Sequence, residues 1–192
     1  MKKKNTFLQF LGLFLLALIF ILQTGCNKDE NNNPETGTAE LNVSLKSSVT
    51  SRSDYEAVYI DIQKVSIHTS TDSTAASGWF DLEANAGIYD LIDYENGNDT
   101  IIALDASLQV QTVSQIRLIL GNNNTIVESG ETYNLETPSA QTSGIKIQIH
   151  ALLQPNKAYK VVLNFDADNS IVKTGNDKYK LKPVINATVV QF

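Results

Sequence analysis

Oxygen-bearing side chains near the C-terminal end of the chain have the spacing with which a calcium-binding loop begins and ends: they belong to Asp166, Asp168, Ser170 and Asp177. Calcium takes carboxylate and hydroxyl oxygens at alternate positions of such a loop. Ile171, however, stands where the tight turn needs glycine, and Asp177 is shorter than the glutamate that closes the loop. The alternative is structural, because an Asp at a strand exit caps the following turn through its carboxylate. Calcium is therefore a weak candidate, and no other cofactor is predicted.

Side chains suited to catalysis are few and widely separated. His68 and His150 are the only histidines, and neither has a second histidine at metal-ligand spacing. The sequence has no Gly-x-Ser-x-Gly nucleophile elbow, phosphate loop or dinucleotide fingerprint. Acidic pairs such as Asp90 with Asp93 occur, but acidic residues are so common that chance supplies several. We therefore predict that the protein is not an enzyme, with a hydrolase as the minor alternative.

Arg117 is one of only two arginines, and it falls on the polar face of an apolar strand. A guanidinium in that position can form a bidentate pair with a carboxylate and so fix the strand register. Asp166 is the candidate partner, and Asp168 and Asp81 are the alternatives. We favour such a pair over direct contact with a ligand.

Four aromatic residues fall near predicted loops, where exposed Trp and Tyr can stack on sugar rings: Trp79, Tyr89, Tyr94 and Tyr133. Trp79 is the only tryptophan of the chain. Because a single large aromatic side chain contributes most when buried, we favour a core anchor for Trp79 over a sugar platform.

Two short motifs indicate modification of the surface. Asp72-Ser73-Thr74 and Asp99-Thr100-Ile101 resemble the acceptor motif for O-linked glycosylation in exported Bacteroidota proteins, and both fall in predicted loops. Ser73 and Thr100 are the candidate acceptors. Triplets arise easily by chance, so this prediction is conditional on export.

The N-terminal residues have the pattern of an export signal. Lys2-Lys3-Lys4 precede an apolar run over 7–22, which is too short to favour a permanent membrane span. Cys26, the only cysteine, follows Gly25. A small residue before cysteine resembles the lipobox of bacterial lipoproteins, which implies a signal peptide over 1–25 and a lipid on Cys26 that anchors the chain.

The residues after Cys26 indicate where in the cell envelope the protein is located. Lys28, Asp29 and Glu30 resemble the export signal of Bacteroidota surface lipoproteins; the alternative is a charged, solvated spacer. We predict a protein anchored in the outer membrane and facing the cell exterior, with the periplasmic face as the alternative. Residues 26–38 are predicted to be a flexible tether, and 39–192 to be one domain.

The charge balance restricts the partners. Three of the 15 basic residues precede Cys26, whereas all 21 acidic residues follow it. The exported part is therefore strongly acidic, which argues against nucleic acid or an anionic membrane surface as a partner, since either needs a basic patch. The lipid anchor remains the predicted contact with a membrane.

Apolar residues recur with a period of two rather than 3.6, as in half-buried strands. The alternating sets are Leu41, Val43, Leu45; Val58, Ile60, Ile62; Val65, Ile67; Ile116, Leu118, Leu120; Ile145, Ile147, Ile149; Tyr159, Val161, Leu163, Phe165; and Tyr179, Leu181, Pro183. Turn-rich segments separate them. We predict an all-β, antiparallel two-sheet sandwich, immunoglobulin-like or transthyretin-like, with a closed barrel as the alternative and short helical turns near 88–94 and 103–109.

Several motifs occur in a characteristic order: Gly78-Trp79-Phe80-Asp81-Leu82, Asp90-Leu91-Ile92, Gln115-Ile116-Arg117-Leu118, Gly144-Ile145-Lys146, Phe165-Asp166-Ala167-Asp168-Asn169-Ser170 and Tyr179-Lys180-Leu181-Lys182-Pro183. Together they resemble the domain of unknown function 4382 (DUF4382) family, a lipoprotein family of Bacteroidota. Relatives tend to have Gly-x-Tyr before the Gln-Ile-Arg-Leu strand, where this chain has Gln111-Thr112-Val113. The resemblance implies the fold and export of the chain, and implies no activity.

The sequence therefore predicts a non-catalytic, surface-exposed lipoprotein that acts as a binding or accessory module of the cell envelope, with a glycan or protein ligand. A structural or adhesive subunit that uses edge-strand pairing is the first alternative, and an exposed apolar edge over 184–192 would favour it. A hydrolase is the second, and a deep cleft that joins a carboxylate pair or a histidine would favour it.

Overall fold

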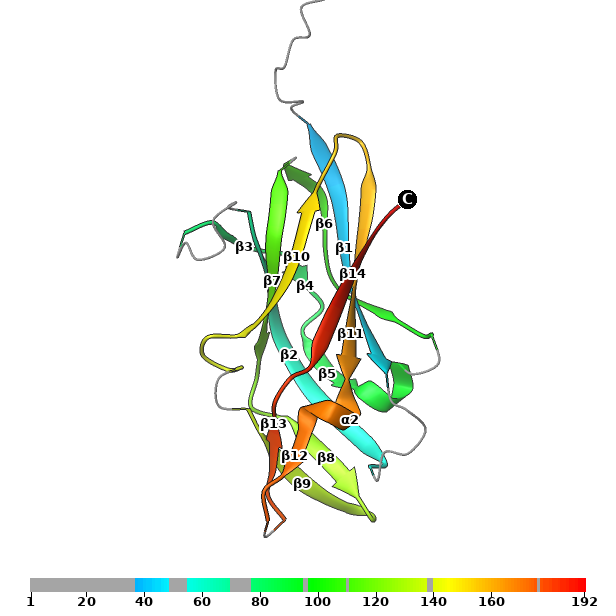
Figure 1. The fold of residues 1–192 in the computed structure, drawn as a ribbon, viewed down its shortest axis with the longest axis vertical. Coiled ribbons are helices and arrows are strands. Elements are labelled where there is room, and N and C mark those ends of the chain that lie inside the picture. Colours follow the sequence, from blue (N-terminus) through cyan, green and yellow to red (C-terminus); the bar gives the residue numbers. More distant parts are fainter. Residues whose placement is uncertain are drawn as a thin grey trace, which may run out of the picture. The chain divides into compact units, whose positions relative to one another are not determined.

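Alternating apolar and polar residues form strands along the described chain, and these strands build two sheets (Figure 1). The computed structural model describes residues 37–48, 55–69, 77–94, 97–109, 111–137, 140–175 and 177–192. The predicted signal peptide, Cys26, the export signal of residues 28–30, nearly all of the predicted tether and Ser73 lie outside these residues.

The first sheet has five strands in the order β14-β11-β1-β6-β4. Their bounds are Ile185–Gln191 (β14), Ala158–Asp166 (β11), Thr38–Ser48 (β1), Thr100–Gln109 (β6) and Glu83–Ala84 (β4). β1 is parallel to β11 and antiparallel to β6, so the sheet is mixed rather than purely antiparallel. The long stretch of chain between β1 and β11 provides the crossover that parallel neighbours need.

The second sheet has nine strands, seven of them in the order β10-β7-β2-β8-β9-β13-β12, with β3 and β5 also paired to β2. Their bounds are Ile145–Leu152 (β10), Thr112–Leu120 (β7), Ala57–His68 (β2), Thr125–Glu128 (β8), Glu131–Glu136 (β9), Tyr179–Leu181 (β13), Ile171–Lys173 (β12), Trp79–Asp81 (β3) and Gly87–Asp90 (β5). β9 and β13 are parallel. β2 has strand partners on both edges, so it is the centre of this sheet.

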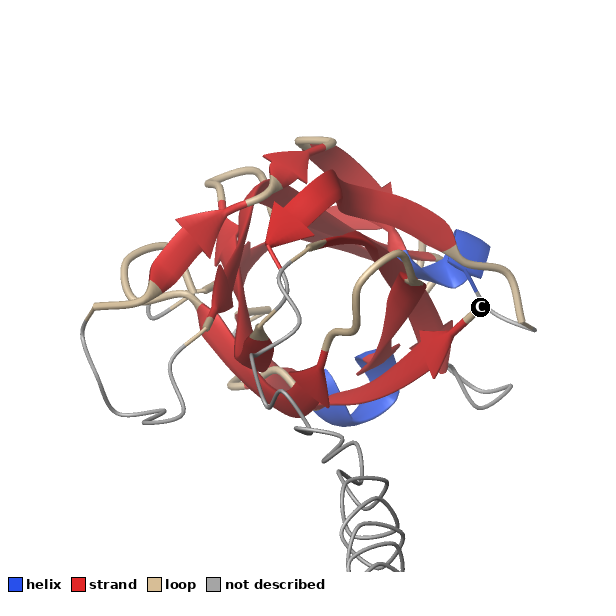
Figure 2. Cartoon of the chain, turned by 90° about the horizontal axis from the view of Figure 1, so that it is seen from above, coloured by secondary structure: helices blue, strands red, loops and turns tan. Residues whose placement is uncertain are grey.

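The predicted inward-facing residues form the core between the sheets, which confirms the all-β sandwich. Side chains from both sheets are fully buried there, among them Val43, Val58, Val65, Ile116 and Leu163. Figure 2 shows that strands dominate the described chain and that only two short helical segments lie beside them. The period of two in the apolar residues therefore reflects the burial of alternate side chains along each strand.

One of the two expected helical turns is present and the other is wrong. A 3₁₀ helix, η2, covers Leu91–Tyr94. Residues 103–109, in contrast, belong to β6, because their backbone pairs with β1 on one side and, at Ala103 and Leu104, with β4 on the other. A short α-helix, α2, covers Ala167–Ser170. Within the described residues, no helix has the length and apolar character to cross a membrane.

Candidate functional site

A loop of four residues interrupts what would otherwise be one continuous partner strand of β2. β7 pairs with β2 as far as Leu120 opposite Ile62, and β8 resumes with Thr125 opposite Tyr59. Residues 121–124 therefore lie over Asp61, whose exposed fraction is only 2%. This loop begins with glycine because a β-carbon on Gly121 would lie 2.2 Å from Oδ2 of Asp61.

The buried Asp61 carboxylate is held by hydrogen bonds from neutral donors. The backbone N–H of Asn123 donates to Oδ2 of Asp61 over 3.2 Å, and the Gln63 amide donates to Oδ1. The Asp61 backbone is engaged as well: its N–H donates to Oδ1 of Asn124 at 2.9 Å, and its carbonyl accepts from the N–H of Gly121 at 2.7 Å. A buried carboxylate needs such donors, so Asp61 organises the loop above it.

The same loop is tied to the chain that follows β9. Nδ2 of Asn124 donates to the Gly121 carbonyl at 2.7 Å and to Oγ1 of Thr137 at 3.4 Å. Nε2 of Gln141 donates to Oγ1 of Thr137 at 3.0 Å and to the Gly121 carbonyl at 3.2 Å. These contacts hold the loop in a fixed relation to Thr137 and Gln141.

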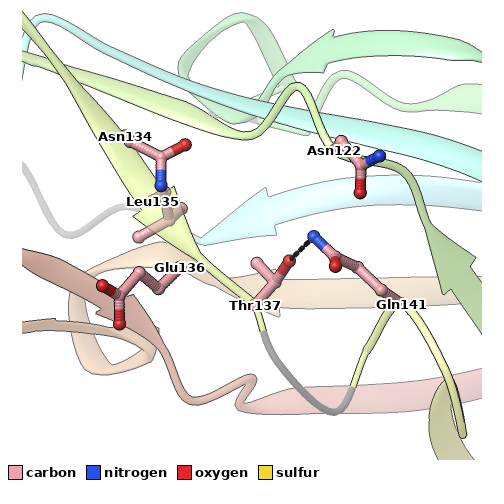
Figure 3. Close-up of a pocket in the computed structure, with 6 residues that line it drawn as sticks. All are labelled: Asn122, Asn134, Leu135, Glu136, Thr137 and Gln141. Atoms are coloured by element: carbon pink, nitrogen blue, oxygen red, sulfur yellow. Dashed lines mark hydrogen bonds between the residues drawn. The ribbon is translucent and has the colours of Figure 1, made fainter.

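A pocket of about 360 Å³ opens beside this network, between the loop and the end of β9. Its wall consists of Asn122, Asn134, Leu135, Glu136, Thr137 and Gln141 (Figure 3). Asn122, Asn134 and Gln141 are exposed, and Thr137 is buried beneath them. Amide groups both donate and accept hydrogen bonds, so the wall can bind neutral polar groups such as hydroxyls.

A second cluster lies on the outward side of the nine-stranded sheet and contains His68. Nδ1 of His68 lies 2.9 Å from Oγ of Ser114, and Nε2 lies 2.9 Å from the Ser77 carbonyl oxygen. The exposed fractions of His68 and Ser114 are 0% and 1%. Both side chains are buried, and their contacts join β2, β7 and the segment before β3.

The Trp79 ring packs against the His68 ring and stacks with the guanidinium of Arg117. The ring centroids of Trp79 and His68 are 4.9 Å apart, and the guanidinium carbon of Arg117 lies 4.1 Å from the centre of the Trp79 ring. Nζ of Lys146 lies 5.7 Å from the same centre. Cation–π attraction favours these contacts. Trp79 is half-buried and lies outside the apolar core, so the predicted core anchor is wrong. Its ring is engaged with neighbouring side chains instead.

Asp81 neutralises a neighbouring lysine. Nζ of Lys64 donates to Oδ2 of Asp81 at 2.8 Å, and Oγ of Ser66 donates to Oδ1 at 2.7 Å. The hydrogen bond from Lys64 lowers the pKa of Asp81 most, followed by that from Ser66, and the charge of Arg117 lowers it further. The positive charge of Arg117 therefore favours the ionised form of Asp81, one of the carboxylates considered as its partners.

Asp166 acts within its own turn. Its Oδ1 accepts from the N–H of Asn169 at 3.0 Å and its Oδ2 from Nδ2 of Asn169 at 2.8 Å, as expected of the N-cap of α2. Asp166 ends β11 in one sheet while Arg117 lies on β7 in the other. The structure does not bring this pair together.

The predicted calcium ligands are separated by regular structure. Asp168 lies in α2, and Ser170 is buried with its Oγ accepting from the N–H of Val184 at 2.8 Å. Asp177 lies beyond β12, so helix and strand replace one continuous loop. The described residues contain no group of three or more His, Cys, Asp or Glu placed to hold a metal ion.

Tyr133, another aromatic candidate, packs against Tyr179. Tyr179 is fully buried, and the Tyr133 ring lies 5.2 Å from it. The Tyr179 hydroxyl donates to Oε2 of Glu128 at 2.6 Å, and Nζ of Lys173 donates to the same oxygen at 2.7 Å. The hydrogen bond to Glu128 raises the pKa of Lys173, and that bond lowers the pKa of Glu128. This cluster joins β8, β12 and β13.

Four further candidates have plain structural positions. Tyr89 and Tyr94 pair with ring centroids 6.2 Å apart. Thr100 begins β6 rather than standing in a loop, and the carboxylate of the preceding Asp99 pairs with Lys160. His150 is exposed at an irregularity of β10, with a φ of 52°.

The Asp61 network was not predicted from the sequence. Asp61 stands between Ile60 and Ile62, so alternation alone assigns it to the solvent side. The loop over 121–124 has the composition of a simple turn, and its sequence does not indicate that it folds back over β2. The available signal was the combination of an acidic residue in the central apolar strand with glycine at the start of an asparagine-rich loop.

Comparison with known proteins gives one result. No curated protein and no solved structure matches the chain significantly. Residues 36–183 match the family described as Domain of unknown function (DUF4382). This region runs from β1 through β13 and ends before β14. Since it covers well over half of the sequence, the chain belongs to the DUF4382 family.

Proposed function

We propose that this protein is a non-catalytic binding module of the bacterial cell envelope, anchored by a lipid on Cys26 in the outer membrane and facing the cell exterior, and that its amide-lined pocket binds a glycan. The observation that carries the proposal is the pocket beside the Asp61 network, lined by Asn122, Asn134 and Gln141. Its volume of about 360 Å³ falls within the range of small-ligand sites, about 300–1,000 Å³.

The chemistry of the wall favours sugar hydroxyls. A hydroxyl donates one hydrogen bond and accepts others, and a side-chain amide offers both functions. The hydrogen bonds from Gln141 and Asn124 to Thr137 and Gly121 hold the wall before a ligand arrives. A wall that is already ordered loses less conformational entropy on binding, which raises affinity.

The absence of catalysis is proposed because the groups that could supply it are committed elsewhere. His68 and Ser114 are buried. The carboxylate of Asp61 is buried beneath the loop and accepts hydrogen bonds from it. Glu136, the carboxylate of the pocket wall, lies 3.6 Å from Nζ of Lys180.

Binding is tested with the detergent-solubilised full chain on a glycan array, followed by calorimetry on each hit. Asn134→Ala and Gln141→Ala each remove a wall amide, and each should weaken binding about fivefold, the equivalent of a hydrogen bond of about 1 kcal/mol. Asn186→Ala removes an exposed amide on β14 and is the matched control. If no glycan binds, or if the wall variants bind as wild type does, the proposal is wrong.

Location is tested by protease treatment of intact cells. Wild type should be cleaved, Cys26→Ala should be released from the membrane, and the variant with Lys28, Asp29 and Glu30 changed to alanine should be protected. Cleavage of wild type only after the outer membrane is opened would favour the periplasmic face.

A second candidate function is edge-strand pairing, because one observation favours it. β14 is an edge strand of the five-stranded sheet, and the large apolar residues in and beside it are 40% exposed at Val184, 46% at Val190 and 67% at Phe192. Edge strands with exposed apolar residues pair readily with other chains. If this edge pairs with a second copy of the chain, wild type should self-associate in sedimentation experiments, and Val190→Lys should abolish that association.

A further inference from the structure

We infer that Arg117 and Lys146 form an anion subsite for the carboxylate of an acidic sugar, so that the ligand of the amide-lined pocket is a uronate-containing oligosaccharide. This inference rests on the glycan-binding function proposed above. On the outward side of the nine-stranded sheet, one row of residues crosses four strands. Asp81 of β3 pairs with Ser66 of β2, Ser66 with Arg117 of β7, and Arg117 with Lys146 of β10.

The charges in this row do not cancel. Asp81 is its only acidic member, and that carboxylate is bound to Lys64 at 2.8 Å and to Ser66 at 2.7 Å. Arg117 and Lys146 are direct cross-strand neighbours, and side chains in such positions lie close together. Two adjacent cations in a chain with six more acidic than basic residues form a local positive site.

The guanidinium of Arg117 is held in place but not satisfied. Its carbon lies 4.1 Å from the centre of the Trp79 ring. Its Nε is buried without a hydrogen-bond partner, and within the described part of the chain the group forms no ion pair. Guanidinium offers five N–H donors in a planar fork that matches a carboxylate. Nε itself is too deeply buried to meet a ligand, but the terminal nitrogens form no hydrogen bond or ion pair within the described residues, so the fixed guanidinium can receive an anion there.

One short segment links this subsite to the pocket. Gln141 lines the pocket, and Gly144, three residues later, packs against Arg117. A β-carbon on Gly144 would lie 2.7 Å from Cγ of Arg117, and its φ of 74° also favours glycine. The segment from Gln141 to Gly144 therefore runs from the pocket wall to the Arg117 side chain, and the ligand inferred here is an extended one that follows this segment.

The spacing indicates an oligomeric ligand. Arg117 and Gly121, where the pocket loop begins, are four residues apart along the chain, which corresponds to about 13 Å in a strand. A single small anion cannot span that length. An oligosaccharide places hydroxyl groups at the amide wall and a carboxylate at Arg117. An acidic peptide is the competing occupant, and the test below separates the two.

The experiment measures calorimetric binding of an oligogalacturonate and of its neutral methyl ester to the detergent-solubilised full chain. Wild type should bind the acid about tenfold more tightly than the ester, as expected for a charge-assisted hydrogen-bonded pair. Added salt should reduce that preference, because the subsite is partly exposed. Arg117→Gln should lose the preference while ester binding is retained.

Lys182→Gln is the matched control, since it removes one positive charge from an exposed position outside this row. Thermal unfolding shows whether Arg117→Gln is folded. If it is not, Lys146→Gln replaces an exposed lysine of the same row and should lower the affinity for the acid severalfold.

The possible failures are distinguishable. Equal binding of acid and ester, unaffected by Arg117→Gln, overturns this inference and leaves glycan binding in place. Failure of every acidic and neutral oligosaccharide to bind overturns both. Displacement of the oligogalacturonate by polyglutamate, with the same dependence on Arg117, assigns the subsite to acidic peptides and overturns the sugar assignment.

Discussion

Gly121 lies so close to the buried Asp61 that a β-carbon at this glycine would come within 2.2 Å of Oδ2. The loop over 121–124 can therefore cover the carboxylate only if its first residue has no side chain. This contact connects the core strand β2 to the pocket, because Asn123 and Asn124 of the loop bond to Asp61 and Gly121 accepts from Gln141.

Gly121→Ala should destabilise the fold by about 1–3 kcal/mol, the usual cost of overpacking a buried site. The added methyl group would have to displace the Asp61 carboxylate from its donors. Urea unfolding measures the change as a lower midpoint. Gly87→Ala is the control, because nothing lies within 4 Å of a β-carbon there. Equal midpoints for the two variants would show that the loop does not cover Asp61 in solution.

Asp61→Ala should cost about 1–3 kcal/mol of stability, because it leaves the N–H of Asn123 and the Gln63 amide without their acceptor. It should also weaken ligand binding at the pocket, since the loop loses its attachment to β2. Calorimetry and urea unfolding measure both effects. A variant that is destabilised yet binds as tightly as wild type would separate the network from the pocket.

Asp166→Asn should leave stability nearly unchanged, because asparagine caps a helix about as well as aspartate. Asp166→Ala should cost about 1 kcal/mol through loss of the cap on α2. Thermal unfolding with and without calcium tests the alternative role. A calcium-dependent rise in melting temperature that disappears in Asp166→Asn would establish a calcium site and contradict a purely structural role.

Stability should fall as the pH drops below about 4.5, partly through Glu128. The ordinary pKa of this carboxyl is 4.5, and the hydrogen bonds from Lys173 and then Tyr179 lower it in the folded state. The unfolded chain therefore binds the proton first as the pH falls, which removes the stabilisation of the folded state progressively below the ordinary value. Glu128→Gln should flatten the dependence measured by urea unfolding. A pH dependence equal to that of wild type would contradict this role of Glu128.

Trp79 is the only tryptophan of the chain, so its fluorescence reports on the stack with Arg117. Arg117→Gln should change the emission, because it removes a cation that lies 4.1 Å from the ring centre. Lys182→Gln should leave the emission as it is in wild type. Identical spectra for all three proteins would mean that the stack is not populated in solution.

The strands and the core were predictable because each strand carries its own signal. Leu41, Val43 and Leu45 alternate with polar residues, and all three are buried. The prediction of a helical turn near 103–109 was wrong because a short segment without a clear local preference forms a strand when neighbouring strands can pair with it. Here the pairing of β6 with β1 and β4 decides the outcome.

The sequence by itself determined the all-β sandwich, the burial of alternate residues and the membership of the family, since these depend on local periodicity and on motifs in order. Only the tertiary structure decided that Asp61 is buried, that Asp166 caps α2 rather than pairing with Arg117, and that Arg117 stacks on Trp79. The physical reason is that these contacts join residues far apart in sequence. Which side chains meet there depends on strand order and register, and neither is encoded in a local pattern.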